Sequence, residues 1–185
     1  MIKGKTISLR PVEERDLGEF HSKLIDMESR GPWYPLPRTS LTKLRGAFNE
    51  AGFWTPDEGI FLIVDGADRL LGNVDWNKLN GDVPDVELGY RVFDQANFGR
   101  GIATEAVALL TNWLFDSHLM NRLRLTIHVD NIGSRRVAEK CGFTKEGMSR
   151  EAWYHRGRWQ DIDVYTLTRT ESNERRRGQG SDGGG

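Results

Sequence analysis

The sequence has only one cysteine, Cys141, among its 185 residues. Because a disulfide needs two cysteines, the chain is not an internally disulfide-bonded scaffold, and its composition fits a reducing compartment. The formal net charge at pH 7 is −1. A charge so close to zero gives no reason to expect a nucleic acid or an anionic membrane as a partner.

Long apolar runs are also missing: none approaches the roughly 20 residues that a membrane-spanning helix needs. The first residues lead into a strand pattern without the apolar core of a signal peptide. We therefore expect a cytoplasmic monomer or homodimer with a single domain over residues 1–170. The polar tail, residues 171–185, contains too little apolar surface to fold and is expected to be disordered.

Several chemical motifs are absent as well. No cluster of Cys and His has the spacing of a metal site, so no metal is predicted. No serine has the flanking glycines of a nucleophile elbow. A P-loop is excluded because no Gly-Lys-Ser/Thr follows Gly99 and Gly101, and Thr104 stands where a dinucleotide fingerprint needs its third glycine.

The hydrophobic pattern predicts strands and helices in mixed order. A strand at residues 6–9 precedes a helix ending near Met27 and a second helix capped by Ser40. The later strands are expected at 59–64, 70–76, 86–93 and 122–129 and in a final hairpin from Trp153 to Leu167, with helices starting at Ile102 and after Asn131. This order predicts an α+β fold with a mixed, mostly antiparallel sheet.

A glycine-rich turn, Gly99-Arg100-Gly101, lies between the strand at 86–93 and the helix that begins at Ile102. Glycines let the backbone approach a ligand closely, and the first turn of a helix offers unpaired N–H groups with a favourable dipole. These features are typical of a phosphate site, to which Arg100 would add a charge-assisted contact. A tight turn that needs glycine only for its geometry remains the alternative.

Three stretches together resemble the GNAT family of N-acetyltransferases, in particular the branch of the ribosomal-protein N-acetyltransferases RimJ and RimL. They are Glu87-Leu88-Gly89-Tyr90, the run from Gly99 to Ala106, and Asn131-x-x-Ser134 followed by the run from Glu139 to Phe143. The segments Ile7–Pro11 and Gly157–Asp161 also resemble that branch. The resemblance covers residues 5–169 and implies a GNAT-like sheet with splayed central strands and flanking helices.

The resemblance also implies how acetyl-CoA would bind as co-substrate. Its pyrophosphate would lie on the backbone amides of Gly99, Arg100, Gly101, Ile102, Ala103 and Thr104. Its pantetheine arm would lie between the splayed strands and bond to the backbone near Val92 and Phe93. Asn131 would hydrogen-bond the pantetheine or the acceptor; the alternative is that it only caps the helix that follows, although both roles can coexist.

Two positions depart from the family pattern. Phe98 takes a position that usually holds Arg or Gln, so one phosphate contact is lost. Ala138 stands where many members carry the tyrosine that protonates the leaving thiolate. In the RimL-like branch a serine, here Ser134, is the acid instead, although Ser134 would also serve as a simple helix-capping residue.

The resemblance implies transfer of an acetyl group to a primary amine, either a protein N-terminus or a small molecule. Glu87, on the polar face of its strand, is the candidate base; the alternatives are a surface carboxylate or a charge partner for Arg91. An acceptor pocket would use Trp33, Tyr34 and Tyr154, with Trp153 nearby, unless these aromatics belong to the core. A non-catalytic acyl-CoA-binding module remains the alternative function.

Overall fold

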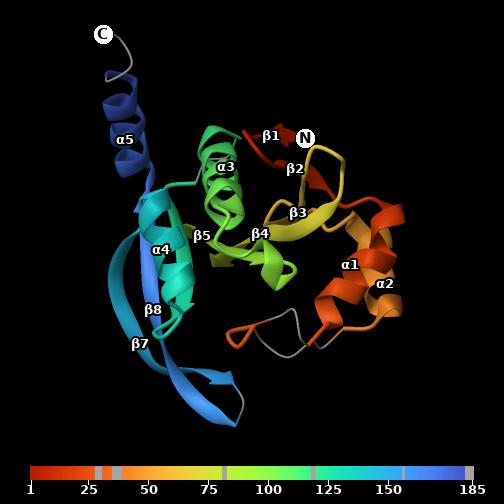
Figure 1. The fold of residues 1–185 in the computed structure, drawn as a ribbon. Coiled ribbons are helices and arrows are strands. Elements are labelled where there is room, and N and C mark those ends of the chain that lie inside the picture. Colours follow the sequence, from red (N-terminus) through yellow and green to blue (C-terminus); the bar gives the residue numbers. More distant parts are fainter. Residues whose placement is uncertain (28–30, 35–38, 81–82, 118–119, 156, 182–185) are drawn as a thin grey trace. The chain divides into compact units, whose positions relative to one another are not determined.

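The computed structural model describes residues 1–27, 31–34, 39–80, 83–117, 120–155 and 157–181 (Figure 1). Their contacts divide the chain into two compact units. We call residues 1–77 and 89–110 the N-terminal unit, and residues 78–88 and 111–185 the C-terminal unit. Three elements pass from one unit into the other along the chain: β4 (Leu70–Asn80), β5 (Val83–Val92) and α3 (Ile102–Ser117).

Antiparallel strands form the sheet of the N-terminal unit. β1 (Ile2–Lys3), β2 (Ser8–Pro11), β3 (Glu58–Val64) and β4 follow one another in that order, and β5 is the next neighbour of β4. The predicted hairpin is confirmed by β3 and β4, in which Phe61 lies opposite Val74. Its β-branched and aromatic residues suit a pleated, buried surface.

Two helices of the N-terminal unit bury their apolar sides in one cluster. The short helix η1 (Glu14–Asp16) leads into α1 (Leu17–Ile25), and α2 (Leu41–Ala51) follows. Phe20 of α1 and Leu44 of α2 pack with residues of β3 and with Phe93. As predicted, Ser40 caps α2, because its side chain accepts a hydrogen bond from the Lys43 backbone N–H.

The C-terminal unit contains the parallel part of the fold. The first half of β5 runs parallel to β6 (Arg122–His128), β6 pairs antiparallel with β8 (Arg158–Thr168), and β8 pairs antiparallel with β7 (Thr144–His155). The parallel ladder ends with the pair Glu87–Arg124, whereas β6 continues beside β8 as far as His128. Buried and partly exposed residues alternate along β6, as predicted.

The remaining helices are α4 (Ile132–Cys141) and α5 (Arg169–Ser181). The structure differs here from the expected disordered tail, because α5 is helical up to Ser181 and buries Ser172. Arg176 fixes this helix by donating hydrogen bonds to Asp116 and Asn112. None of the helices described has both the length and the apolar character needed to cross a membrane.

Candidate functional site

The glycine-rich turn lies between η2 (Gln95–Asn97) and α3. Gly99 and Gly101 have φ angles of 72° and 83°, which side chains with a Cβ rarely adopt. The Glu105 N–H donates to the Gly101 carbonyl oxygen at 2.9 Å, so the amides of residues 102–104 precede the first helical hydrogen bond. The sequence therefore builds a turn that directs backbone N–H groups out of the N-terminus of α3.

This turn is open to solvent. Gly99, Arg100 and Gly101 are exposed, and a Cβ added at either glycine would have no described atom within 4 Å. An anion therefore has free access to the amides and to the positive end of the α3 dipole. The residues fit the diphosphate that the sequence predicted here.

The end of β5 provides a second set of backbone groups. The Phe93 N–H donates to the Leu71 carbonyl oxygen of β4 at 2.7 Å, and the Phe93 carbonyl accepts from the Asn97 side chain at 3.1 Å. Because backbone groups alternate along a strand, the N–H and C=O of Val92 point to the edge away from β4. Of the two residues predicted to hold the pantetheine, Val92 thus has the better-directed groups.

Two of the predicted acceptor residues belong to the N-terminal unit. Tyr34 donates its hydroxyl to the Tyr90 carbonyl oxygen at 3.0 Å, and its ring centroid lies 5.0 Å from the guanidinium carbon of the buried Arg91. Trp33 beside it is half-buried. Tyr34 therefore connects this segment to β5. Residues 35–38 of the same proline-rich loop lie outside the described residues.

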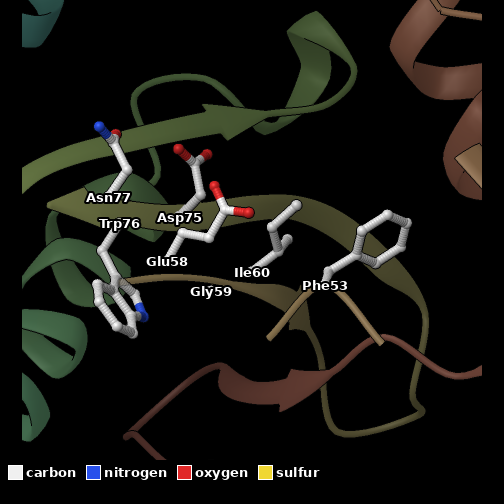
Figure 2. Close-up of a pocket in the computed structure, with 7 residues that line it drawn as sticks. All are labelled: Phe53, Glu58, Gly59, Ile60, Asp75, Trp76 and Asn77. Carbon is white, nitrogen blue, oxygen red and sulfur yellow. The ribbon is translucent and has the colours of Figure 1, made fainter. Parts of the chain in front are cut away.

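A pocket of about 290 Å³ opens in the N-terminal unit on β3 and β4 (Figure 2). Glu58 lies opposite Asn77 in the register, and Ile60 lies opposite Asp75, so these four side chains share one face of the sheet. Figure 2 shows the two carboxylates on this face, whereas Trp76 projects to the other.

Sequence reasoning missed this pocket, although a signal was present. The polar residues Asn73, Asp75 and Asn77 alternate with Val74 and Trp76 along β4, and such alternation marks a polar face on a strand.

Glu87 lies in the C-terminal unit, where the parallel ladder ends. Its carboxylate accepts a hydrogen bond from the Thr126 hydroxyl at 2.5 Å. Thr126 follows Arg124 on the same face of β6, and Arg124 is the register partner of Glu87. The side chain of the candidate base is thus positioned by β6.

Asn131 and Ser134 meet at the start of α4. The Asn131 side-chain oxygen accepts from the Ser134 backbone N–H at 3.1 Å, which confirms the capping interpretation of Asn131. Ser134 is half-buried, and Ala138, four residues later on the same side of the helix, is fully buried. A tyrosine at position 138 would have to displace its packed neighbours.

Tyr154, the third predicted acceptor residue, belongs to the C-terminal unit. It is 60% exposed near the end of β7, and its ring centroid lies 5.3 Å from that of Trp159. Trp153 next to it is half-buried. Over the parts of the chain that the structure describes, no three His, Cys, Asp or Glu side chains gather as metal ligands would.

Comparison with known proteins gives a consistent result. The family model of the acetyltransferase (GNAT) domain matches residues 6–144. The probable N-acetyltransferase YjcK of Bacillus subtilis is 31% identical over 94% of this chain and 100% of its own. The ribosomal-protein-serine acetyltransferase of Escherichia coli is 29% identical over 53% of this chain and 54% of its own.

Solved structures support the fold. The spermidine N-acetyltransferase of Vibrio cholerae, in complex with CoA and spermine, superposes with a TM-score of 0.81 at 22% identity. The superposition covers 92% of this chain and 99% of that one. The predicted α+β fold with a mixed sheet is thereby confirmed.

Proposed function

The chain belongs to the GNAT acetyltransferase family, and from this we propose that it transfers the acetyl group of acetyl-CoA to a primary amine by direct attack in a ternary complex. The exposed glycine turn before α3 carries the proposal. Its left-handed glycines and open surroundings give the backbone amides the access that a diphosphate needs.

The residues of the turn would hold the co-substrate. The amides of residues 99–104 would bind the pyrophosphate, and the exposed Arg100 would add a charge-assisted hydrogen bond. The Val92 backbone would bind the pantetheine, with Asn131 as a further hydrogen-bond partner. Acetyl-CoA supplies an acyl thioester, so the amine needs no other activated group.

The reaction needs a neutral amine, and free alkyl amines have a pKa of about 10. Glu87 would take the proton from the acceptor, directly or through a water molecule. The amine nitrogen then forms a bond to the thioester carbonyl carbon, and the oxygen that becomes negative would be held by the N–H near Val92. The C–S bond breaks as the amide forms, and the surplus proton of the nitrogen leaves to the CoA thiolate or to solvent.

Ser134 would donate a hydrogen bond to the departing sulfur. A thiol has a pKa of about 8.5, so the thiolate is a good leaving group and little proton transfer is needed. The burial of Ala138 supports this role. Because position 138 faces the packed interior, a hydrogen-bond donor on that side of α4 is best supplied by Ser134, one turn earlier. Most of the acceleration would come from positioning.

The experiment combines purified protein, acetyl-CoA and a panel of amines, and measures both free CoA thiol and acetylated amine. We expect Glu87→Gln to lower kcat by about 100-fold at pH 7, with partial recovery at higher pH, where more amine is already neutral. We expect Ser134→Ala to lower kcat by about fivefold, because removal of one hydrogen bond costs about 1 kcal/mol.

Glu139→Gln, an exposed change on α4, is the matched control and should leave kcat unchanged. Unaltered kcat in both Glu87→Gln and Ser134→Ala would remove these residues from the chemistry.

The acceptor class follows from the RimJ/RimL-like branch as a proposal. Relatives include a ribosomal-protein-serine acetyltransferase and a spermidine acetyltransferase, so protein α-amines and small-molecule amines both belong in the panel. Trp33, Tyr34 and Tyr154 are the proposed acceptor contacts. Substitution of a true contact should raise KM for the amine and leave KM for acetyl-CoA unchanged.

A non-catalytic acyl-CoA-binding module is the second candidate. Ala138 favours it, because the proton donor usual in the family is missing at that position. Binding of acetyl-CoA without release of thiol in the presence of any amine would support this candidate over the enzyme.

A further inference from the structure

Two carboxylate–arginine pairs follow one another where β5 runs parallel to β6 in the C-terminal unit. Asp85 is the register partner of Arg122, and Glu87 is the register partner of Arg124. Residues two apart on a strand share a face, so these four side chains lie on the same face of the sheet. The two pairs are therefore equivalent in position and can be compared directly.

The two pairs differ in their contacts. Asp85 Oδ2 lies 3.7 Å from Arg122 Nε, as expected for opposite charges on neighbouring strands. Glu87 has a side chain one methylene longer, yet in the part of the chain that the structure describes it forms no ion pair with Arg124. The buried Nε of Arg124 has no hydrogen-bond partner among those residues either. The cation beside Glu87 is thus not used by its carboxylate.

The Thr126 hydroxyl accounts for this difference. It donates to Glu87 Oε1 at 2.5 Å, and Thr126 lies two residues beyond Arg124 on the same face, about 6 to 7 Å further along β6. The bond therefore draws the carboxylate past its register partner and towards the end of the parallel ladder. For Asp85, the residue two positions beyond its partner is an arginine rather than a hydroxyl residue.

The choice of partner decides how well a carboxylate can accept a proton. A guanidinium favours the charged form of a carboxylate, and its parallel N–H groups can occupy both oxygens. A threonine hydroxyl is neutral and supplies a single donor. Because Thr126 bonds to Oε1, the second oxygen of Glu87, Oε2, stays available to a proton.

We propose that Thr126 is a positioning residue for Glu87, and that its hydroxyl keeps the carboxylate out of an ion pair with Arg124. The catalytic consequence rests on the proposed function, whereas the choice of hydrogen-bond partner does not. In the reaction, Glu87 Oε2 accepts the proton that the ammonium form of the acceptor loses. Thr126 keeps its own proton throughout.

The first experiment measures kcat and both KM values with an amine that the wild type acetylates. Thr126→Val keeps the shape of the side chain and removes its hydroxyl, and we expect it to lower kcat by about tenfold with KM for acetyl-CoA unchanged. Thr126→Ser keeps the hydroxyl and should retain kcat within about twofold. Thr144→Val, an exposed change on β7, is the matched control and should leave kcat unchanged. Wild-type kcat in Thr126→Val would overturn the proposal.

The second experiment separates positioning from a general structural effect. If Arg124 captures the carboxylate in Thr126→Val, then Arg124→Met added to that variant should restore kcat to within about threefold of the wild type. In a Glu87→Gln background, Thr126→Val should lower kcat no further, because the group on which it acts is gone. A loss that Arg124→Met does not restore, or that adds to the loss in Glu87→Gln, would overturn the proposal.

The third experiment needs no catalysis, so it separates a failure of this inference from a failure of the proposed function. Crystal structures of the wild type and of Thr126→Val show which partner the Glu87 carboxylate takes. We expect the bond to Thr126 in the wild type, and a Glu87–Arg124 distance below about 4 Å in the variant. A carboxylate that stays apart from Arg124 in the variant would overturn the inference. Wild-type kcat in Glu87→Gln would instead remove the proposed base and the catalytic consequence with it.

Discussion

At the scale of single residues, Arg10 and Asp16 show how a polar pair becomes part of the core of the N-terminal unit. Arg10 Nη1 and Nη2 lie 2.7 and 2.9 Å from the two Asp16 carboxylate oxygens, and the side chains are 7% and 11% exposed. Burial raises the pKa of Asp16, but hydrogen bonds from Arg10 and from the Glu13 N–H outweigh this effect and lower the pKa below its usual value.

Asp16→Asn should destabilise the protein by about 3 kcal/mol, because it leaves a buried guanidinium without its main partner. Since the folded-state pKa is lowered, the stabilisation is present above the unfolded pKa of about 3.9 and is lost as pH falls through the folded value. The difference from the wild type should thus be full at pH 7 and shrink below about pH 4. Urea unfolding at several pH values measures it, with the exposed Glu14→Gln as control. A difference that does not change with pH would contradict the ionic origin.

At the scale of elements, α5 depends on Arg169. The guanidinium donates to the Phe115 and Met120 carbonyl oxygens and lies 5.4 Å from the Phe115 ring centroid. It thereby provides donors at the C-terminal end of α3, where carbonyls have no helical partner.

Arg169→Met should lower the free energy of unfolding by about 2 kcal/mol, because two carbonyls lose charged donors. Arg169→Lys should recover only part of the loss, since an ammonium lacks the planar fork. Guanidinium unfolding followed by circular dichroism gives both values, and Arg177→Met, exposed on the same helix, is the control. If Arg177→Met costs as much as Arg169→Met, the contacts described are not the cause.

Elements with a strong local pattern were predictable from the sequence. The alternation in β6 and the cap at Ser40 follow from neighbours in the chain, and both were found. Helix α5 was not predicted, because its polar sequence gives no local reason to fold. The contacts of Arg176 with Asp116 and Asn112 are separated by 60 and 64 residues, and no local pattern reveals such pairs.

At the scale of the whole molecule, the candidate site also has parts that could be predicted from the sequence and parts that could not. The glycine turn was found because strand, glycines and helix are consecutive in sequence. The acidic pocket was missed because Glu58 and Asp75 become neighbours only through the register of β3 and β4. The predicted roles of Glu87, Ser134 and Tyr154 stay predictions.

Ligand binding should change the stability of the whole chain. At a concentration of 100 times Kd, acetyl-CoA should stabilise the native state by about 2.7 kcal/mol and raise Tm by roughly 5 to 10 °C. Gly101→Ala should reduce this increase, because a left-handed turn disfavours a Cβ and the amides would reorient. Differential scanning fluorimetry with and without acetyl-CoA measures the increase.

Gly46→Ala, an exposed and unobstructed change on α2, should retain the full increase in Tm. A full increase in Gly101→Ala as well would argue against the turn as the diphosphate site.

The absence of a side chain at position 89 has a consequence for the sheet of the N-terminal unit. A Cβ at that position would lie 2.4 Å from one Asp75 carboxylate oxygen and 2.9 Å from the other, so Gly89→Ala would force the Asp75 side chain to move. The place that Asp75 takes on the face of β4 thus depends on a neighbouring strand that carries only a hydrogen at this position.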